Sequence, residues 1–335
     1  MHLGIWNYLD NFVDMLNSNK PYNFKDMRYV VTGGAGFIGS HIVEELIAQN
    51  HEVMIFDNLF SGKEKNIEPF LKFPDVKFVN GSITDQALLK EVFEGVDGVF
   101  HEAAIASVPR SVANPSASNE ANVTGTLNVL IAARDAGVKK VLFASSSSVY
   151  GDTPTLPKTE EMKPSPLSPY AVSKLAGEYY MGVFSSVYGV KTLSLRYFNV
   201  FGPRQDPKSE YAAVIPKFIT AILKQESPII YGDGRQTRDF TYVKDVARAN
   251  IKGMESDAEG VCNIAYCKRI DLIELADIIM DITGINVPLN FEPPRPGDVH
   301  DSLADITRAQ KVFCYSPEFT VRSGLNETVN WYKNQ

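Results

Sequence analysis

The stretch that decides the fold is Thr32-Gly33-Gly34-Ala35-Gly36-Phe37-Ile38-Gly39, which joins a short β-branched run to a segment of helical periodicity ending near Gln49. Its glycines at 33, 36 and 39 follow the spacing G-x-x-G-x-x-G, a variant of the dinucleotide-binding fingerprint. The first glycine permits a tight turn, the second lets the backbone approach a pyrophosphate, and the third lets helix and strand pack closely. The helix would then offer free N–H groups and its positive dipole end to phosphates. The stretch predicts a dinucleotide site.

The residue that ends the next predicted strand indicates which dinucleotide to expect. Residues 52–57 (EVMIFD) form this strand, and Asp57 lies 18 residues after Gly39. Its carboxylate can accept hydrogen bonds from an adenosine ribose and would repel a 2′-phosphate at close range. The sequence therefore favours NAD over NADP.

Apolar strands and amphipathic helices continue to alternate outward from this region. The expected strands are 28–33, 52–57, a stretch at 78–79, 98–101 and 139–145, and the expected helices are 39–49, 86–94 and 122–136. Such alternation predicts an α/β fold with a Rossmann-type, doubly wound parallel sheet covered on both faces. After about residue 200 the chain is richer in Gly and Pro, with helices expected at 214–225 and 271–283, which predicts a smaller C-terminal domain.

A tyrosine and a lysine four residues apart suggest proton-transfer chemistry. Ser168 can cap a helix that begins at Pro169, so Tyr170 and Lys174 share one helix face. A lysine ammonium beside a phenol lowers the phenol's pKa, and such a tyrosine can act as acid or base near neutral pH. The serine run 145–148 follows the fifth strand and would present hydroxyls at the C-terminal edge of the sheet, where ligands bind in this architecture.

Composition excludes several other classes of protein. The chain has 335 residues and a net charge of −7, from 33 Lys and Arg against 40 Asp and Glu, which argues against a nucleic-acid-coating protein. No run of about 18 apolar residues exists, so no membrane span is expected. Cys262, Cys267 and Cys314 form no C-x-x-C pair or zinc spacing, so we expect no metal site and a reducing cytoplasm. Residues 1–26 are predicted to form an amphipathic helix that docks on its own domain or on a partner subunit, rather than a signal peptide.

Taken together, four motifs resemble the extended short-chain dehydrogenase/reductase family. They are TGGAGFIG at 32–39, HEAA at 101–104, the serine run at 145–148 and YAVSK at 170–174, and the similarity runs from about Arg28 to the C-terminus. The resemblance implies bound NAD and a nucleotide-sugar substrate. It also implies that Tyr170 is the active-site base, that Lys174 contacts the nicotinamide ribose, and that Ser146 is the hydroxyl partner.

The resemblance divides the chain and places the cofactor. It implies an N-terminal extension at 1–26, an NAD-binding domain at 27–198 plus about 241–270, and a nucleotide-sugar-binding domain at 199–240 plus about 271–335. The implied cofactor-binding residues are Gly33, Gly36, Phe37, Ile38, Gly39, Asp57, Asn58, Ser61, Gly62, Ser82, Ile83, Ala103, Ala104, Tyr170, Lys174 and Tyr197. Ser82-Ile83 departs from the Asp-Ile or Asp-Leu pair that often contacts adenine in this family, which would weaken cofactor affinity without changing the chemistry.

Two smaller features indicate the branch of the family. Dehydratases carry an adjacent Asp-Glu pair that eliminates water, whereas this chain has Ser147 and Ser148. Without elimination, a 4-keto sugar can only be reduced again, and reduction from the other face gives 4-epimerisation. Seven residues after Arg295, epimerases specific for plain sugars often place a tyrosine, whereas Ser302 would leave room for a 2-acetamido group.

The resemblance also implies a set of substrate-binding residues. Arg238 and Arg295 match the family's diphosphate-binding arginines, and Asp298 is expected to accept from a ribose hydroxyl. The implied substrate-binding residues are Ala106, Ser107, Arg110, Ser146, Ser147, Ser148, Asn199, Ala213, Val214, Tyr231, Arg238, Arg295, Asp298 and Ser302.

The favoured interpretation is an NAD-dependent 4-epimerase of UDP-N-acetylglucosamine and UDP-N-acetylgalactosamine. Three alternatives stay open: the same reaction on UDP-glucose and UDP-galactose, a UDP-glucuronate 4-epimerase or decarboxylase, and a non-enzymatic NAD-sensing or scaffold protein. Arg110 or Arg204 would have to bind the carboxylate in the second alternative. The third would be expected to lose Tyr170, Lys174 or Ser146, and all three are present. The family suggests a homodimer through helices near 122–136 and 170–187.

Overall fold

The computed structural model describes residues 27–207, 213–294 and 300–335. The predicted helix within 1–26, and the predicted site residues Arg295 and Asp298, lie outside the described residues.

A seven-stranded parallel sheet forms the centre of the molecule, in the order β11-β6-β5-β4-β1-β2-β3. Its strands are β1 (Arg28–Thr32), β2 (Glu52–Asp57), β3 (Val76–Asn80), β4 (Gly98–His101), β5 (Lys140–Ser146), β6 (Lys191–Tyr197) and β11 (Gly260–Ile264). The strand order reverses between β1 and β4, so a crevice is expected at the carboxyl ends of these strands. The predicted doubly wound α/β fold is confirmed.

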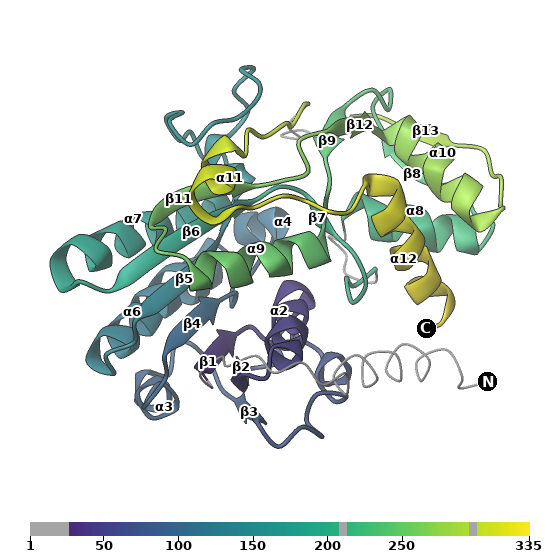
Figure 1. The fold of residues 1–335 in the computed structure, drawn as a ribbon. Helices are drawn as coiled ribbons and strands as arrows, with labels where there is room; N and C mark the ends of the chain where they lie inside the picture. Colours follow the sequence, from purple (N-terminus) through teal and green to yellow (C-terminus); the bar gives the residue numbers. More distant parts are fainter. Residues whose placement is uncertain (1–26, 208–212, 295–299) are drawn as a thin grey trace.

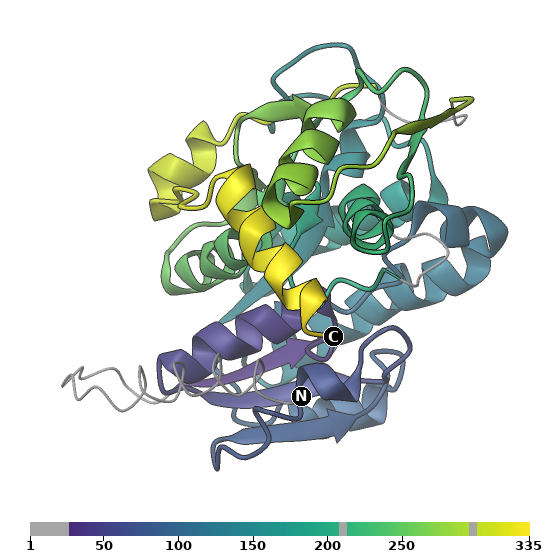
Figure 2. The same cartoon turned by 90° about the vertical axis from the view of Figure 1, so that its right-hand side faces the viewer.

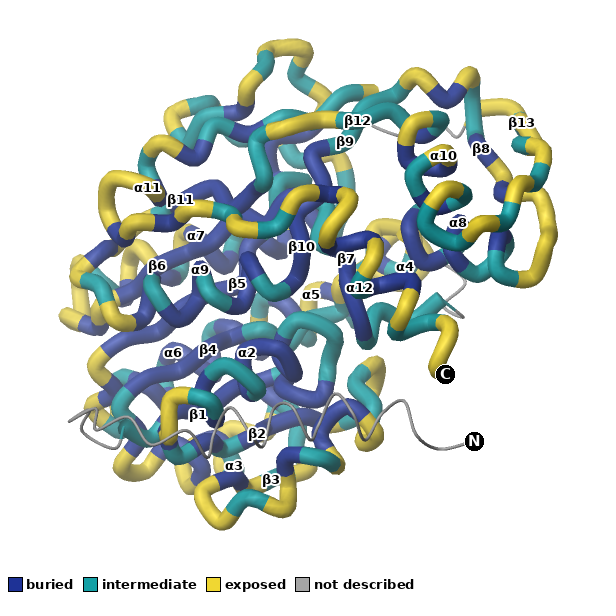
Figure 3. The backbone as a smooth tube through the Cα atoms, turned by 45° about the vertical axis from the view of Figure 1, so that its right-hand side comes forward, coloured by how far each residue is buried: buried dark blue, intermediate teal, exposed yellow. Residues whose placement is uncertain are grey.

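Helices cover both faces of the sheet, which explains why its central strands are apolar on both sides (Figure 1). On one face, α2 (Phe37–Ala48) packs against α9 (Val243–Glu255), and Ile42 and Val246 belong to the same buried cluster as Val31. On the other face lie α3 (Gln86–Val92), α6 (Gly125–Asp135) and α7 (Pro169–Tyr188). The tube in Figure 3 shows the strands as the buried centre, with exposed residues concentrated in the surrounding loops.

A second, smaller core lies beside the carboxyl edge of the sheet, among the helices that face the viewer in Figure 2. It contains apolar side chains of α8 (Val214–Leu223), α10 (Leu272–Thr283) and α12 (Val321–Lys333). Short two-stranded pairings border it: β7 (Val200–Phe201) with β10 (Thr241–Tyr242), β8 (Ile229–Tyr231) with β13 (Asn290–Glu292), and β9 (Thr237–Asp239) with β12 (Arg269–Asp271). The helix α11 (Thr307–Phe313) instead packs on β11 of the central sheet.

The observed elements differ from the expected ones mainly at their ends. The first helix begins at Phe37 rather than Gly39, and a π-helical turn at Glu120–Thr124 precedes α6 in place of one continuous helix from 122. Two short helices, α4 (Val108–Ala113) and α5 (Pro115–Asn119), were not expected. The side chains of Ser107 and Asn114 cap them, each accepting a backbone N–H at N3.

Candidate active site

The glycine turn is built for close contact between backbone segments. Gly33 has φ +70°, and a Cβ there would lie 2.7 Å from the backbone nitrogen of Ala103, which follows β4. A Cβ at Gly39 would lie 2.3 Å from the carbonyl oxygen of Gly33. The turn is therefore restricted to glycine by backbone conformation at one position and by space at both. Because these glycines carry no side chains, the N–H groups at the start of α2 are open to a pyrophosphate at the carboxyl edge of the sheet.

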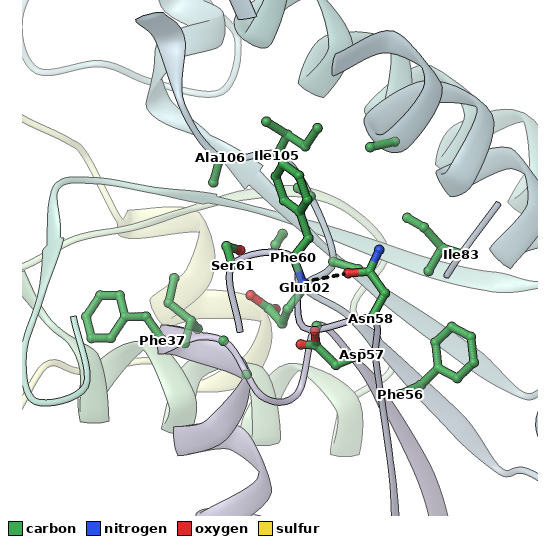
Figure 4. Close-up of a pocket in the computed structure, with 18 of the residues that line it drawn as sticks. Phe37, Phe56, Asp57, Asn58, Phe60, Ser61, Ile83, Glu102, Ile105 and Ala106 are labelled. Carbon is green, nitrogen blue, oxygen red and sulfur yellow. Dashed lines mark hydrogen bonds between the residues drawn. The ribbon is translucent and has the colours of Figure 1, made fainter. Parts of the chain in front are cut away.

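A cavity of about 380 Å³ opens above this turn (Figure 4). Most predicted cofactor residues line it: Gly33, Gly36, Phe37, Ile38, Gly39, Asp57, Asn58, Ser61, Ser82, Ile83, Ala103, Ala104, Tyr170, Lys174 and Tyr197. Gly62 does not line the cavity but lies against Asp57, since a Cβ there would be 2.8 Å from both carboxylate oxygens. Ala106, predicted on the substrate side, also faces this cavity. The first cavity is thus continuous from the glycine turn to the Tyr170–Lys174 pair.

Backbone N–H groups hold the Asp57 carboxylate at the end of β2. Oδ2 accepts from Ala35 N at 3.0 Å and Oδ1 accepts from Leu59 N at 2.7 Å. Burial raises the pKa of Asp57, and the two hydrogen bonds oppose this rise. Each oxygen keeps a lone pair for a further donor, so the carboxylate suits a ribose diol. The glycine turn and Asp57 together fit the adenosine diphosphate portion of NAD.

Tyr170 lies in the first turn of α7, whose start is fixed by two serine hydroxyls. Ser168 Oγ accepts from Ala171 N at 3.2 Å, and Ser111 Oγ accepts from Tyr170 N at 3.0 Å. Burial raises the pKa of the Tyr170 phenol, while its hydrogen bond with Ser146 lowers it. Tyr170 and Ser146 are therefore brought together although Ser146 lines neither cavity.

Lys174 lies on the same helix and lines the same cavity as Tyr170, as the spacing predicts. Its Nζ donates to the carbonyl oxygen of Ala144 at 2.7 Å and lies 5.9 Å from the centre of the Tyr170 ring. Burial lowers the pKa of Lys174 to about 8. The expectation that Lys174 depresses the Tyr170 pKa does not hold in this arrangement, because burial dominates and the net direction for Tyr170 is upward.

A half-buried carboxyl group, Glu102, was missed from the sequence. Tyr197 donates its hydroxyl to Glu102 Oε1 at 2.8 Å, and Asn250 Nδ2 donates to the Tyr197 oxygen at 2.8 Å. Burial raises the pKa of Glu102 to about 7, and its charge raises the pKa of Tyr170. Glu102 lines the cavity with Tyr170 and Lys174. An acidic residue directly after an apolar strand, in His101-Glu102-Ala103, was the signal that could have identified it.

Next to Lys174 on α7 lies a buried ion pair. Arg196 on β6 forms two hydrogen bonds with Glu178, one helical turn after Lys174, at 2.8 and 2.7 Å. Both side chains are only 4% exposed, and Ser145 donates to the same carboxylate. A pair buried to this extent holds its geometry tightly. It fixes α7 against β5 and β6, and so fixes Tyr170 and Lys174 relative to the sheet edge.

A second cavity, of about 280 Å³, adjoins the smaller core. Of the predicted substrate residues, Asn199, Ala213, Val214, Tyr231 and Arg238 line it. Ser302 lies behind Asn199, at 2.9 Å between Oγ and Nδ2. Six other predicted substrate residues line neither cavity: Ser107, Arg110, Ser146, Ser147, Ser148 and Ser302. Of the predicted substrate residues, the structure thus places five on this cavity and Ala106 on the first, and it leaves six on neither.

The serine run has no acidic side chain where elimination chemistry would need one. Ser146 caps the 3-10 turn at Ser147–Tyr150, accepting from Ser148 N at 3.2 Å. The Ser148 hydroxyl is buried and has no hydrogen-bond partner among the residues that the structure describes. A serine hydroxyl cannot serve as a general acid near neutral pH.

The described ranges hold neither a cluster of metal-binding side chains nor a membrane-spanning helix. No group of three or more His, Cys, Asp or Glu side chains is arranged there to hold a metal ion. None of the helices in the same ranges is both long and apolar enough to cross a membrane.

Comparison with known proteins places this geometry in context. The sequence model of the NAD dependent epimerase/dehydratase family matches residues 29–266. A solved UDP-N-acetylglucosamine 4-epimerase from Methanobrevibacter ruminantium M1, in complex with UDP-N-acetylmuramic acid, is 46% identical with a TM-score of 0.89, covering 92% of this chain and 99% of that one. The UDP-glucose 4-epimerase of Mycolicibacterium smegmatis is 38% identical over 92% of this chain and 99% of its own length. A UDP-glucuronate 4-epimerase of Thermodesulfobacterium geofontis is 36% identical over 91% of this chain and 96% of its own length.

Proposed function

Because the chain belongs to the NAD dependent epimerase/dehydratase family, we propose that it is a UDP-sugar 4-epimerase that interconverts UDP-N-acetylglucosamine and UDP-N-acetylgalactosamine. The observation that carries this proposal is that Tyr170 lies on the first cavity and interacts with Ser146, the last residue of β5, while Ser147 and Ser148 follow where the family's dehydratases place acids.

NAD, when bound, supplies the acceptor and then the donor of the hydrogen removed from C4 of the sugar. The turn at Gly33 and Gly36 would hold its pyrophosphate, and Asp57 its adenosine ribose. Tyr170 takes the proton of the 4-hydroxyl and later returns it, so no proton is gained or lost over the cycle. Ser146 fixes the phenol oxygen through its hydrogen bond. Lys174, anchored on Ala144 O, contributes a positive charge on the same side of the cleft.

The serine run explains why the reaction would stop at epimerisation. A 4,6-dehydratase must protonate a leaving hydroxyl, which needs an acid of suitable pKa. Ser147 and Ser148 offer only hydroxyls at the positions where the family's dehydratases place acids. The oxidised sugar therefore has one outcome, reduction at C4, and reduction of the opposite face inverts that centre.

Several features support an N-acetylated substrate. Residue 302 is a serine, half-buried and hydrogen-bonded to Asn199, so it takes little room beside the second cavity. The solved relative from Methanobrevibacter ruminantium M1, 46% identical, is a UDP-N-acetylglucosamine 4-epimerase. UDP-glucose and UDP-galactose form the second candidate pair, favoured by the name of the Mycolicibacterium smegmatis relative.

UDP-glucuronate is less well supported by the charges near the site. The two cations suggested for its carboxylate are already engaged: Arg204 pairs with Glu44 at 2.5 Å, and Arg110 stacks on the Phe60 ring. Neither of them lines the second cavity. A uronate would therefore lose hydration without gaining a ready counter-charge from these residues.

We also propose a homodimer, formed by the outer faces of α6 and α7. Val172, Tyr179, Val183 and Val187 are exposed at spacings of seven, four and four along α7. Half-exposed Leu127 and Ile131 extend this apolar stripe onto the neighbouring α6. Such a stripe is typical of a helical subunit interface. The free cysteines Cys262, Cys267 and Cys314 fit a protein of the reducing cytoplasm.

The experiment that tests the proposed function uses purified, NAD-loaded protein with one UDP-sugar at a time. UDP-N-acetylglucosamine, UDP-glucose and UDP-glucuronate are each incubated, and the anomeric proton signals are followed by NMR. We expect the 4-epimer of the acetylated sugar to form to equilibrium, with slower conversion of UDP-glucose. Exclusive turnover of UDP-glucuronate, or loss of carbon dioxide from it, would contradict the proposal.

A further inference from the structure

The carboxyl group of Glu102 lies at the acid–base end of the first cavity, the end defined by Tyr170 and Lys174. Glu102 is the first residue after β4, and it lines this cavity (Figure 4), as do Tyr170 and Lys174. Its hydrogen-bond partner Tyr197 ends β6 and is paired in register with Ser146 at the end of β5. Because Ser146 interacts with Tyr170, these strand ends bring Glu102 close to the acid–base group.

Hydrogen bonds orient one oxygen of this carboxyl group and leave the other open. The side-chain nitrogen of Asn250 donates to Val246 O at 2.9 Å and to the Tyr197 oxygen at 2.8 Å. The Tyr197 hydroxyl directs its own hydrogen to Glu102 Oε1, which is 2.8 Å away. Glu102 Oε2 has no hydrogen-bond partner among the residues that the structure describes, and it is not fully enclosed. Because Glu102 lines the cavity, this second oxygen is open to it.

The chemistry of 4-epimerisation indicates which part of NAD this end of the cavity receives. C4 of the sugar loses a hydrogen to the cofactor while the hydroxyl on the same carbon loses its proton to Tyr170, so both acceptors must meet one carbon. The glycine turn and Asp57 fit the adenosine diphosphate portion at the other end. The acid–base end is therefore the end that receives the nicotinamide ring.

Among the described residues, three carboxylate side chains line the cavity, and they are placed differently. Asp57 lies at the end of β2, and Asp206 forms an ion pair with Lys63 at 2.6 Å. Lys63 N donates to the carbonyl oxygen of Ala35 in the glycine turn, so this ion pair belongs to the adenosine diphosphate end. Glu102 is the one of these three carboxylates at the acid–base end.

A carboxylate at this end distinguishes between the two forms of the cofactor. The oxidised form of NAD carries one more positive charge than NADH, on the nicotinamide ring, and a negative charge near the ring attracts it across a partly enclosed site. We propose that Glu102 makes the cofactor cavity bind oxidised NAD in preference to NADH. Lys174, the cation at the same end, acts in the opposite direction. Glu102 thereby keeps the resting protein in the form that can accept a hydrogen from its substrate.

Competition between the two cofactor forms measures this preference without any sugar. The purified protein is equilibrated with NAD and NADH mixed in known proportions, and unbound cofactor is removed by gel filtration. The absorbance of reduced nicotinamide relative to that of adenine then gives the bound ratio. In Glu102→Gln, Tyr197 can still donate to the amide oxygen, so the shape is kept and the charge is lost. We expect the bound ratio to shift toward NADH by roughly tenfold.

Two further variants separate charge from shape and from position. Asp206→Asn removes a carboxylate from the same cavity at the adenosine diphosphate end, so it should affect both cofactor forms alike and change the ratio by less than about twofold. Glu102→Asp keeps the charge and should stay within about threefold of the wild-type ratio. An unchanged ratio in Glu102→Gln, an equal shift in Glu102→Asp, or an equal shift in Asp206→Asn would overturn the inference.

The pH dependence of the wild-type ratio is a second test, and it does not depend on a variant that folds. Burial raises the pKa of Glu102 to about 7. The titratable groups that face it among the described residues are Tyr197 on β6 and Tyr170 and Lys174 on α7. Burial raises the pKa of both phenols and lowers that of Lys174 to about 8, so all three keep their protons below about pH 7.

Protonation of Glu102 removes its charge. The preference for oxidised NAD should therefore decline as the pH falls through about 7 in the wild-type protein and stay level in Glu102→Gln. A wild-type ratio that did not respond to pH would overturn the inference.

The inference uses the NAD chemistry of the family and does not depend on the identity of the sugar. A protein that epimerised none of the three UDP-sugars would contradict the proposed function, whatever its cofactor ratio. A protein that epimerised UDP-N-acetylglucosamine, but kept the same cofactor ratio after Glu102→Gln, would contradict only the role assigned to Glu102.

Discussion

The two cavities differ in what forms them: the backbone forms the first, and side chains form the second. The cofactor cavity rests on backbone geometry: a glycine turn at φ +70°, the bare start of α2, and strand ends that bring Asp57 and Glu102 to one edge. The second cavity rests on side chains that meet across long sequence separations, such as Asn199 with Ser302, which are 103 residues apart. The shape of the first cavity depends on positions where no side chain larger than glycine fits. The shape of the second depends on contacts between side chains.

Because of this difference, we expect the two cavities to respond differently to amino-acid substitutions. A turn restricted by backbone contact loses its shape with one added methyl group. A side-chain site can be altered at one position and keep its fold, with a change in which ligand it prefers. We therefore expect substitutions in the first cavity to change cofactor retention, and those in the second to change the ranking of sugars.

At the end of the first cavity that holds Tyr170 and Lys174, Tyr170→Phe should have the largest effect. Removing the phenol oxygen removes the acid–base group while the ring still fills its place. We expect turnover to fall by about 10²–10⁴-fold, with NAD content and the unfolding temperature unchanged. Progress curves on UDP-N-acetylglucosamine measure the rate, and absorbance of released cofactor measures NAD. A variant that kept wild-type turnover would rule out Tyr170 as the base.

Within the cofactor cavity, Gly33→Ala tests the restriction imposed by the backbone. Gly137 supplies a matched control, because it has the same φ of +70° but nothing within 4 Å of an added Cβ. The left-handed conformation alone should cost Gly137→Ala roughly 1–2 kcal/mol of stability. Contact with Ala103 N should cost Gly33→Ala about 1–3 kcal/mol more, together with loss of NAD on gel filtration. Equal destabilisation of the two variants would show that the close approach to Ala103 is unimportant.

Ser302→Tyr tests the second cavity by volume. A tyrosine beside Asn199 would occupy the space proposed for a 2-acetamido group, so we expect kcat/KM for UDP-N-acetylglucosamine to fall about 10–200-fold. The value for UDP-galactose should fall much less. Parallel assays on both sugars give the ratio that matters, and an unchanged ratio would show that residue 302 does not limit sugar size.

Glu102→Gln should have the smallest effect, seen in the pH profile. The Glu102 charge raises the pKa of Tyr170, and Gln keeps the shape without the charge. The Tyr170 pKa should then fall, so the fraction of phenolate, and with it the rising limb of kcat, should move to lower pH. We expect kcat at its optimum to change less than about tenfold. A limb that moved to higher pH, or did not move, would contradict this electrostatic role.

The cofactor side could be predicted from sequence because its signals are local. The glycine spacing, Asp57 at a strand end and the Tyr170–Lys174 spacing each lie within one strand, turn or helix. The same locality explains why the sequence predicted a lowered pKa for Tyr170. Helix spacing places Lys174 nearby, but it does not reveal that the Lys174 ammonium donates to Ala144 O. Burial, which raises the Tyr170 pKa, is a property of the whole fold.

The substrate side was predictable only through family resemblance. Nothing local in the sequence links Asn199 to Asp239 and Ser302, because their contacts depend on how the segment after β6 passes β9. Glu102 was missed for a similar reason, since its hydrogen-bond partner Tyr197 is 95 residues away in the chain. The short helices α4 and α5 have too few residues to show a periodicity.

The buried Asp239 carboxylate has a consequence for the motions of the molecule. It accepts hydrogen bonds from the backbone N–H groups of Tyr266, Cys267 and Ala304. These bonds join three segments that are distant in sequence. None of these amides can exchange with solvent unless the cluster opens, so they should behave as one cooperative unit in native-state hydrogen exchange. Asn199, which donates to Asp239 O and lines the second cavity, would then become mobile only when this whole unit opens.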